Sequence, residues 1–160
     1  MVEKMNRQDK IRAYIETTIF NRYFENDREY TRETLLMFDK ISRGEIEPCT
    51  SAYVVDELLR APSPKKEHML ELIARYDILV LDRDNGAESL AEVYVAAGII
   101  PVKFKMDAIH IAMATLHNVD CIISLNFQHI NKLKTKMATD AINKLNGLDT
   151  PTICTPAEVI

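Results

Sequence analysis

Residues 106–130 read MDAIHIAMATLHNVDCIISLNFQHI, and this stretch decides the fold of the chain. Its first part, Asp107–Leu116, is almost entirely small or apolar, which predicts a buried helix with Asp107 capping the first turn. The apolar run Cys121–Ile123 then predicts a short buried strand. Ser124–Phe127 follows where that strand ends, and ligands of open α/β sheets bind at such carboxyl ends. Asn126 therefore either shapes the turn or belongs to a functional site.

The rest of the chain alternates predicted strands with predicted helices. The apolar patterns predict further strands over residues 11–15, 47–50, 78–81 and 152–155. They predict further helices over residues 19–24, 31–43, 51–61, 65–76, 90–97 and 133–145. Parallel strands need long crossover connections, which are usually helical. The alternation therefore predicts a mainly parallel sheet between two layers of helices, an α/β/α sandwich.

Residues at the ends of the predicted helices support these boundaries. Thr17 or Thr18 is expected to cap the helix over residues 19–24. Met137, Ala141 and Leu145 repeat at helical spacing and predict the buried side of the last helix. Four residues are stop signals that follow predicted helices: Gly44, Gly98, Asn118 and Gly147.

Length and composition indicate one domain of ordinary size. The chain has 160 residues, for which we expect a flexible tail over residues 1–10 and a single domain over residues 11–160. The first ten residues are charged and have no apolar core of a secretion signal. The apolar runs are far shorter than the roughly 20 residues of a membrane span. A cytoplasmic protein without a membrane contact is the expectation.

Cysteine, glycine and charge content argue against several classes of function. Cys49, Cys121 and Cys154 lie far apart without metal-ligand spacing, so we expect buried, reduced thiols. The chain has only four glycines and no glycine-rich phosphate loop, which argues against nucleotide binding. The formal net charge of −4 gives no overall attraction to nucleic acid, so RNA binding would need a local basic patch.

Four oxygen-bearing side chains fall at comparable places in the predicted elements. Glu16 ends the first strand, Glu57 lies in the helix after the second, Asp107 begins the central helix and Asn126 follows the next strand. Right-handed crossovers place such positions on one edge of a parallel sheet. Clustered carboxylates and an amide oxygen suit a hard cation such as Mg²⁺ or Mn²⁺. Such an ion activates bound water and offsets the charge that develops on a phosphodiester.

The order and surroundings of these residues resemble the PIN-domain family, in particular its VapC-like toxin branch. Each matching segment is weak alone, but five occur in the right order with suitable spacing. They are Tyr14–Ile19, Val54–Leu58, Asp107–Ala112, Ile123–Phe127 with His129–Asn131 after it, and Thr155–Glu158. The resemblance implies a parallel α/β/α sandwich and a metal-dependent ribonuclease that acts on single-stranded or structured RNA.

The resemblance also implies roles for individual residues. It implies that the first to fourth acidic places of the family are held here by Glu16, Glu57, Asp107 and Asn126, as catalytic residues and ligands of Mg²⁺ or Mn²⁺. Thr18 and Ser124 match hydroxyl positions that support the first and fourth acids. The chain departs from the family where Glu16 and Asn126 replace the usual aspartates. Glu16 is one methylene longer, and Asn126 keeps an oxygen but lacks the charge.

Simpler explanations exist for each of these residues. Asp107 is also an ordinary helix cap, Asn126 an ordinary turn residue, and Thr18 and Ser124 ordinary local caps. Glu57 has Asp56 beside it as a rival for the second acidic place. Glu16 is the hardest to explain in this way, because a carboxylate that closes an apolar strand needs a partner or a function.

Histidines and lysines complete the set of candidate residues. His110 and His117 share a helical stripe with Asp107, but no further ligand follows, so we expect them at the surface or in an interface. Nothing in the sequence around His68 and His129 indicates a function for them. Basic residues flank both ends of the central unit and are our candidates for RNA-backbone contacts, although an ordinary charged face is the commoner explanation. They are Lys103, Lys105, Lys132 and Lys134, with Lys136 beside them.

The sequence therefore predicts a metal-dependent endoribonuclease, the toxin of a toxin–antitoxin pair. Its expected partners are RNA, a small antitoxin protein and a second copy of the chain, with Tyr53, Tyr94 and Phe104 as candidate interface aromatics. The alternative is a catalytically impaired PIN-like module that binds nucleic acid or protein. A weaker alternative is a receiver domain, which also gathers acids around Mg²⁺ but which has a paired acidic start and a late lysine that this chain lacks.

Overall fold

Five strands form one parallel sheet in the computed structural model, which describes residues 10–160. The predicted tail over residues 1–10 lies outside the described residues except for Lys10. The strand order is β3-β2-β1-β4-β5, and each neighbouring pair is parallel. The strands are β1 (Ile11–Ile15), β2 (Ile46–Ser51), β3 (Leu79–Leu81), β4 (Cys121–Ile123) and β5 (Thr152–Cys154).

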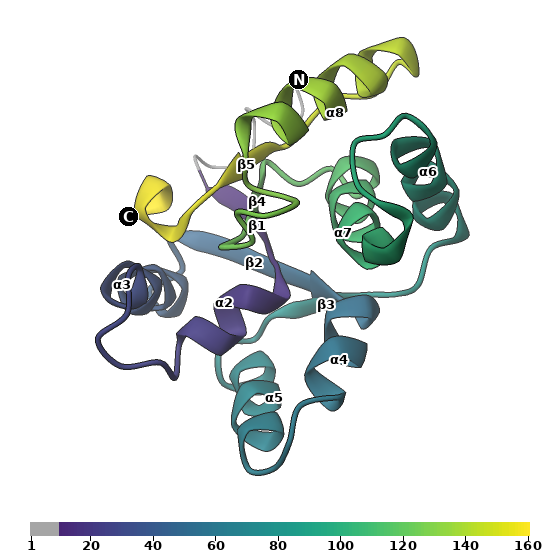
Figure 1. The fold of residues 1–160 in the computed structure, drawn as a ribbon. Helices are drawn as coiled ribbons and strands as arrows, with labels where there is room; N and C mark the ends of the chain where they lie inside the picture. The colour runs from purple at the N-terminus through teal and green to yellow at the C-terminus, as the bar shows by residue number, and fades with distance from the viewer. Residues whose placement is uncertain (1–9) are drawn as a thin grey trace.

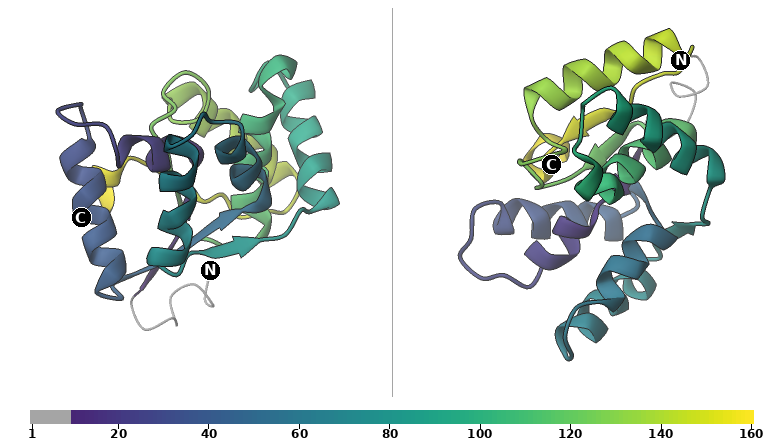
Figure 2. Two further views of the ribbon diagram at one scale, coloured as in Figure 1. Left: turned by 90° about the horizontal axis from the view of Figure 1, so that it is seen from below. Right: turned by 45° about the vertical axis from the view of Figure 1, so that its right-hand side comes forward.

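Helices cover both faces of this sheet. Helices α2 and α3 lie on one side and α6 and α7 on the other, while α8 runs beside β5 (Figure 1). The two further views show the same separation (Figure 2). The helices are α2 (Thr17–Arg22), α3 (Thr31–Ser42), α4 (Ala52–Leu59), α5 (Lys65–Arg75), α6 (Asn85–Ala96), α7 (Lys105–Leu116) and α8 (Leu133–Leu145), with 3-10 turns η1 (Val102–Phe104) and η2 (Pro156–Val159). The predicted α/β/α sandwich is confirmed.

The strand order also separates this fold from the receiver alternative. A receiver domain has the order 2-1-3-4-5, in which the third strand lies beside the first. Here the first strand lies between the second and the fourth, because the chain crosses from β3 back to β4. The receiver interpretation is therefore wrong.

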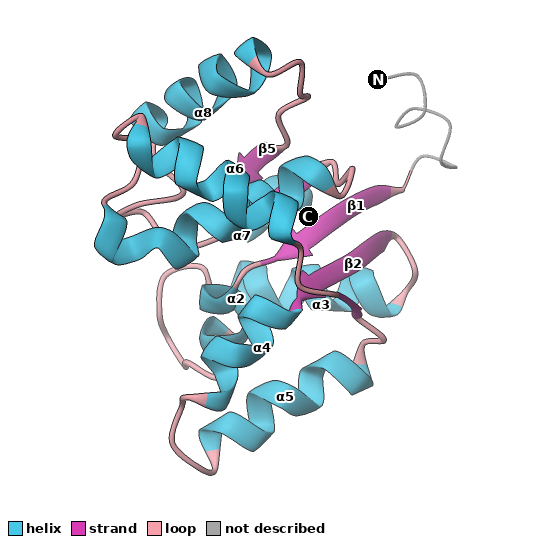
Figure 3. Ribbon diagram, turned by 90° about the vertical axis from the view of Figure 1, so that its right-hand side faces the viewer, coloured by secondary structure: helices cyan, strands magenta, loops and turns pink. Residues whose placement is uncertain are grey.

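The core is built around the central strands and α7. Tyr14, Ile15 and Ile123 are fully buried, as expected for strands that are covered on both faces. Strand β3 lies at the edge of the sheet, which leaves Leu79 partly exposed. Helix α7 packs against α6 (Figure 3) and also contacts β4, and its residues 108–114 are all buried. The buried helix–strand unit predicted at the centre of the chain is confirmed.

Several helix ends agree with the sequence, and others do not. Gly44 (φ +74°) and Asn118 (φ +57°) have the left-handed conformation that ends α3 and α7. Helix α2 begins at Thr17, and its N-cap is Glu16 rather than Thr17 or Thr18, because the Glu16 carboxylate accepts the backbone N–H of Thr18. Helix α7 begins at Lys105, so the predicted cap Asp107 lies within its first turn.

Helix α8 has the predicted bounds, but the face that it buries differs from the predicted one. Met137 and Leu145, expected in the core, are 65% and 83% exposed. The buried side carries Thr135, Thr139 and Asn143. The Asn143 amide bonds Tyr94 and Thr150, so hydrogen bonds anchor this helix together with the partly buried Ile142, which packs against the core. The apolar repeat was therefore a misleading guide to its buried face.

Two further expectations can be assessed within residues 10–160. The three cysteines are buried and free of disulfide bonds, as expected. Across the same residues, none of the helices has both the length and the apolar character needed to cross a bilayer.

Candidate active site

The polar side chains of the candidate site gather where three strands end. Glu16 follows β1, Ser51 ends β2 and Ser124 follows β4. Because these strands are parallel and adjacent, their carboxyl ends meet at one edge of the sheet. Helices α4 and α7 approach the same edge and bring Glu57 and Asp107.

Glu16 is held in place by a set of hydrogen bonds at the start of α2. It is only 2% exposed. Its Oε2 accepts the Thr18 N–H at 2.9 Å, the Thr18 hydroxyl at 2.5 Å and the Ser124 hydroxyl at 3.2 Å. The Thr18 hydroxyl oxygen also accepts the Leu125 N–H at 2.9 Å, which ties α2 to the segment after β4. Burial raises the pKa of Glu16, although the nearby charge of His110 and the Thr18 bonds oppose this effect.

Glu57 faces the same region, whereas its rival Asp56 does not share these contacts. The Glu57 Oε1 accepts hydrogen bonds from the Thr17 hydroxyl, at 2.8 Å, and from His110 Nε2. Burial raises the pKa of Glu57, but the hydrogen bond and charge of His110 outweigh it, and the net pKa is lowered. Asp56 instead forms a two-pronged ion pair with Arg83, at 2.5 and 2.7 Å.

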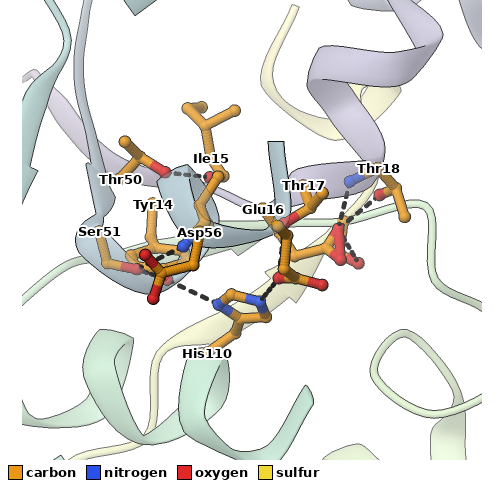
Figure 4. Close-up of polar contacts among 12 residues, drawn as sticks. Tyr14, Ile15, Glu16, Thr17, Thr18, Thr50, Ser51, Asp56 and His110 are labelled. Atoms are coloured by element: carbon orange, nitrogen blue, oxygen red, sulfur yellow. Dashed lines mark hydrogen bonds and ion pairs between the residues drawn. The ribbon is translucent and has the colours of Figure 1, made fainter. Parts of the chain in front are cut away.

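His110 lies at the centre of the arrangement, which overturns its predicted surface location. It is fully buried. A 2.8 Å hydrogen bond joins its Nδ1 to the Tyr14 hydroxyl, which bonds the Ser51 hydroxyl at 2.7 Å. Figure 4 shows the ring between Ser51 and Tyr14 on one side and Glu16 on the other. Burial lowers the pKa of His110, but the Glu57 bond and the surrounding carboxylates outweigh burial and raise it overall.

Asp107 and Asn126 contact one another beside these groups. Burial raises the pKa of Asp107, and the charge of His110 and a hydrogen bond from the Asn126 side chain oppose the shift. The Asn126 Oδ1 accepts the His129 N–H at 2.9 Å, and the Asn126 N–H donates to Ser124 Oγ at 3.0 Å. Asn126 therefore shapes the turn after β4, and its side chain also contacts Asp107.

The predicted basic residues have mixed surroundings. The Lys105 ammonium group pairs with Glu92 at 2.9 Å. The Lys103 ammonium lies 5.8 Å from the centre of the Phe104 ring. Lys132 is the N-cap residue of α8, and both it and Lys134 are exposed.

The other aromatic and histidine residues have mixed surroundings, and two of the three candidate interface aromatics lie in the core. Tyr53 and Tyr94 are buried in the core and are not interface residues, whereas Phe104 is 36% exposed. His117 is half-buried and bonds Asp84 at 2.8 Å. His129 is buried under Phe104, with ring centres 4.1 Å apart, and its Nε2 has no hydrogen-bond partner among the described residues.

The carboxylates of Glu16, Glu57 and Asp107 are the type of ligand that a hard cation prefers, but they are not arranged as a complete metal site. Among residues 10–160, no group of three histidine, cysteine, aspartate or glutamate side chains is arranged to hold a metal ion. The hydrogen bonds described above engage Oε2 of Glu16 and Oε1 of Glu57, so the second oxygen of each carboxylate remains uncommitted to them. Together with Asp107 these oxygens fit the ligand preference of Mg²⁺ or Mn²⁺.

Comparison with known proteins identifies the fold. No protein-family model matches the chain, and no curated protein sequence matches it. Among solved structures, the chain is similar to a chain of VapBC2 from Rickettsia felis, in a structure bound to a DNA fragment from their promoter. The TM-score is 0.54, the match covers 91% of this chain and 98% of that chain, and the sequence identity is 12%. At this identity the similarity concerns the fold, and the activity depends on the site.

Proposed function

We propose that this protein, which has the fold of the PIN-domain proteins, is a metal-dependent endoribonuclease that hydrolyses RNA phosphodiester bonds. The observation that carries the proposal is the meeting of Glu16, Glu57 and Asp107 from three separate elements around the buried His110. Three carboxylates at one partly buried edge repel one another, and a divalent cation relieves that repulsion. Structural ion pairs alone do not require three acids at one place.

In this proposal Glu16, Glu57 and Asp107 hold Mg²⁺ or Mn²⁺. When bound, such an ion polarises a phosphodiester and lowers the pKa of a coordinated water. The chain's own residues fix the acids. Thr18 and Ser124 hold one oxygen of Glu16, and Asn126 contacts Asp107. We assign Asn126 to the orientation of Asp107, because the Asn126 Oδ1 is already bonded to a backbone N–H.

His110 and Thr17 have the corresponding role for Glu57. Both donate to Glu57 Oε1, which fixes the carboxylate plane and leaves Oε2 for a ligand. Outer partners of this kind orient metal ligands and typically change metal affinity by about 10- to 100-fold when they are removed. Tyr14 and Ser51 hold the imidazole from the other side.

We further propose that the protein is cytoplasmic and is the toxin of a toxin–antitoxin pair, with a small antitoxin protein as partner. The support is the fold similarity to a chain of the VapBC2 complex. RNA as substrate and a homodimer remain parts of the same proposal, and the exposed lysines at positions 103, 132 and 134 are candidate RNA-backbone contacts.

A second candidate function is a PIN-like module that binds nucleic acid or protein without cleavage. The observation in its favour is that no three side chains of the described residues form a ready metal centre. The two candidates differ in whether Mn²⁺ binds and in whether RNA is cut.

The deciding experiment compares the wild-type protein with Asp107→Asn on mixed RNA in Mn²⁺ and in EDTA. Asp39→Asn is the matched control, because it removes an exposed carboxylate on α3. We expect wild type and Asp39→Asn to cut RNA only with Mn²⁺, and Asp107→Asn to be at least about 100-fold slower because a charged ligand is lost. Cleavage that persists in Asp107→Asn would contradict the assignment. Absence of both cleavage and Mn²⁺ binding in the wild type would favour the non-catalytic module.

A further inference from the structure

A cleft of about 370 Å³ opens beside Glu57 and runs between α2, α4 and α5. Its lining is continuous with the acidic edge, because Glu57 and its hydrogen-bond donor Thr17 both belong to it. The volume lies within the range of about 300–1,000 Å³ that is usual for small-ligand sites. A larger cleft of about 620 Å³ lies among Lys10, Ile46 and Glu47, at the opposite ends of the strands, and its lining includes none of the candidate-site acids Glu16, Glu57 and Asp107.

Two cations line this cleft in a chain that is acidic overall. They are Arg60, which ends α4, and Lys65, which begins α5. Among the described residues neither forms an ion pair, whereas the neighbouring Lys66 pairs with Glu67 at 3.9 Å. The charge of Arg60 does lower the pKa of the nearby Asp56 and Glu57, but without a direct ion pair. Cations that form no direct ion pair beside an acidic site attract an anionic ligand locally, although the net charge does not.

The rest of the lining is largely apolar. Leu58 and Met69 are buried side chains that contribute to the cleft, and Ala61 and Pro62 lie between the two helices. In single-stranded RNA the bases are unstacked, so a protein can pack side chains against the face of a base as well as contact the phosphates. A cationic side and an apolar side within one small cleft therefore match the two halves of a nucleotide.

We propose that this cleft binds one nucleotide of single-stranded RNA next to the bond that is cleaved. Arg60 and Lys65 contact its phosphate, and its base packs against Ala61 and Pro62, which are accessible in the cleft. The inference rests on the proposed ribonuclease function and adds a substrate subsite to it. It also places RNA contacts on the Glu57 side of the site, away from the lysines singled out by the sequence.

The test is a charge reversal at two adjacent positions of α5. Lys65→Glu changes the cleft, and Lys66→Glu changes the same helix outside it. Both place glutamate in the first turn, where the helix dipole favours a negative charge, so both variants should remain folded. Affinity for a short single-stranded RNA is measured by fluorescence anisotropy between 50 and 200 mM salt, in an Asp107→Asn background in which cleavage is slowed.

We expect Lys65→Glu to weaken binding by about tenfold and to flatten the salt slope by about 0.7, the value for one phosphate contact on a single strand. Lys66→Glu should stay within about twofold of the parent. A duplex of the same sequence should compete poorly, because its bases are stacked and paired. Equal behaviour of the two variants, or equal competition by duplex, would overturn the subsite. Failure of the wild type to cleave RNA would overturn the proposed function separately.

Discussion

The imidazole of His110 links the three acids of the candidate site to Tyr14. Its two ring nitrogens contact Glu57 and Tyr14, and its charge acts on Glu16 and Asp107 as well. A buried polar network of this kind is stable only when each member has a partner. The ring therefore both orients Glu57 and offsets the charge of the acids in the metal-free protein.

Substitution of His110 by two amides of different length separates these contacts. Glutamine places its amide nitrogen near the position of Nε2 and so retains a donor for Glu57, whereas asparagine reaches only the position of Nδ1. We expect His110→Asn to weaken Mn²⁺ binding by about 10- to 100-fold and His110→Gln to weaken it much less. Titration calorimetry measures the affinities, and thermal melts verify the fold. Equal affinities for wild type and both variants would show that His110 does not position Glu57.

The raised pKa of His110 also predicts a pH dependence of stability. A group whose pKa is raised on folding contributes stability that is fully present below its unfolded value, 6.5 here, and is lost as pH rises through the higher folded pKa. In EDTA, the melting temperature of the wild type should therefore fall as the pH increases from 6 to 9. His110→Gln should show a smaller fall, since glutamine does not titrate. Parallel pH profiles would contradict the prediction.

The individual elements show which parts of the structure can be predicted from sequence. Period-two and apolar patterns predict the five strands and most helices, because these patterns reflect burial directly. The parallel order then predicts that Glu16 and Asp107 approach one edge. The Tyr14–His110 and Thr17–Glu57 contacts join residues 96 and 40 positions apart, and no local pattern records them. The position of His110, three residues after Asp107 on the same helix, was the one feature of the sequence that could have indicated that His110 lies in the site.

Helix α8 shows how an apolar repeat fails when hydrogen bonds hold the buried face. Asn143 is fully buried and bonds Tyr94 at 2.5 Å and Thr150 at 3.2 Å, while Leu145 is 83% exposed. We expect Asn143→Ala to lower the free energy of unfolding by about 1–3 kcal/mol, because it leaves the Tyr94 hydroxyl without its partner. Leu145→Ser should change it by no more than about 0.5 kcal/mol. Urea unfolding measures the free energy of unfolding of both variants. A larger decrease in Leu145→Ser than in Asn143→Ala would show that the buried face of α8 is assigned incorrectly.

At the scale of the whole molecule, a bound cation should stabilise the fold. A ligand that binds only the native state adds about 2.7 kcal/mol when present at 100 times its Kd. For a chain of this size, each kcal/mol corresponds to about 2–4 °C in melting temperature. Mn²⁺ should therefore raise the melting temperature of the wild type by several degrees, EDTA should reverse the shift, and Asp107→Asn should abolish it. An equal shift in Asp107→Asn would locate the ion elsewhere.

The complete burial of residues 108–114 has a consequence for the dynamics of the molecule. Amide protons of an element that is covered on all sides exchange with solvent mainly when the entire domain opens. Helix α7 should accordingly be among the last segments to take up deuterium, and it carries both His110 and Asp107. The acidic edge is then anchored in the slowest-exchanging part of the protein. Any rearrangement that accompanies ligand binding must come from the side chains and from the segments around α7.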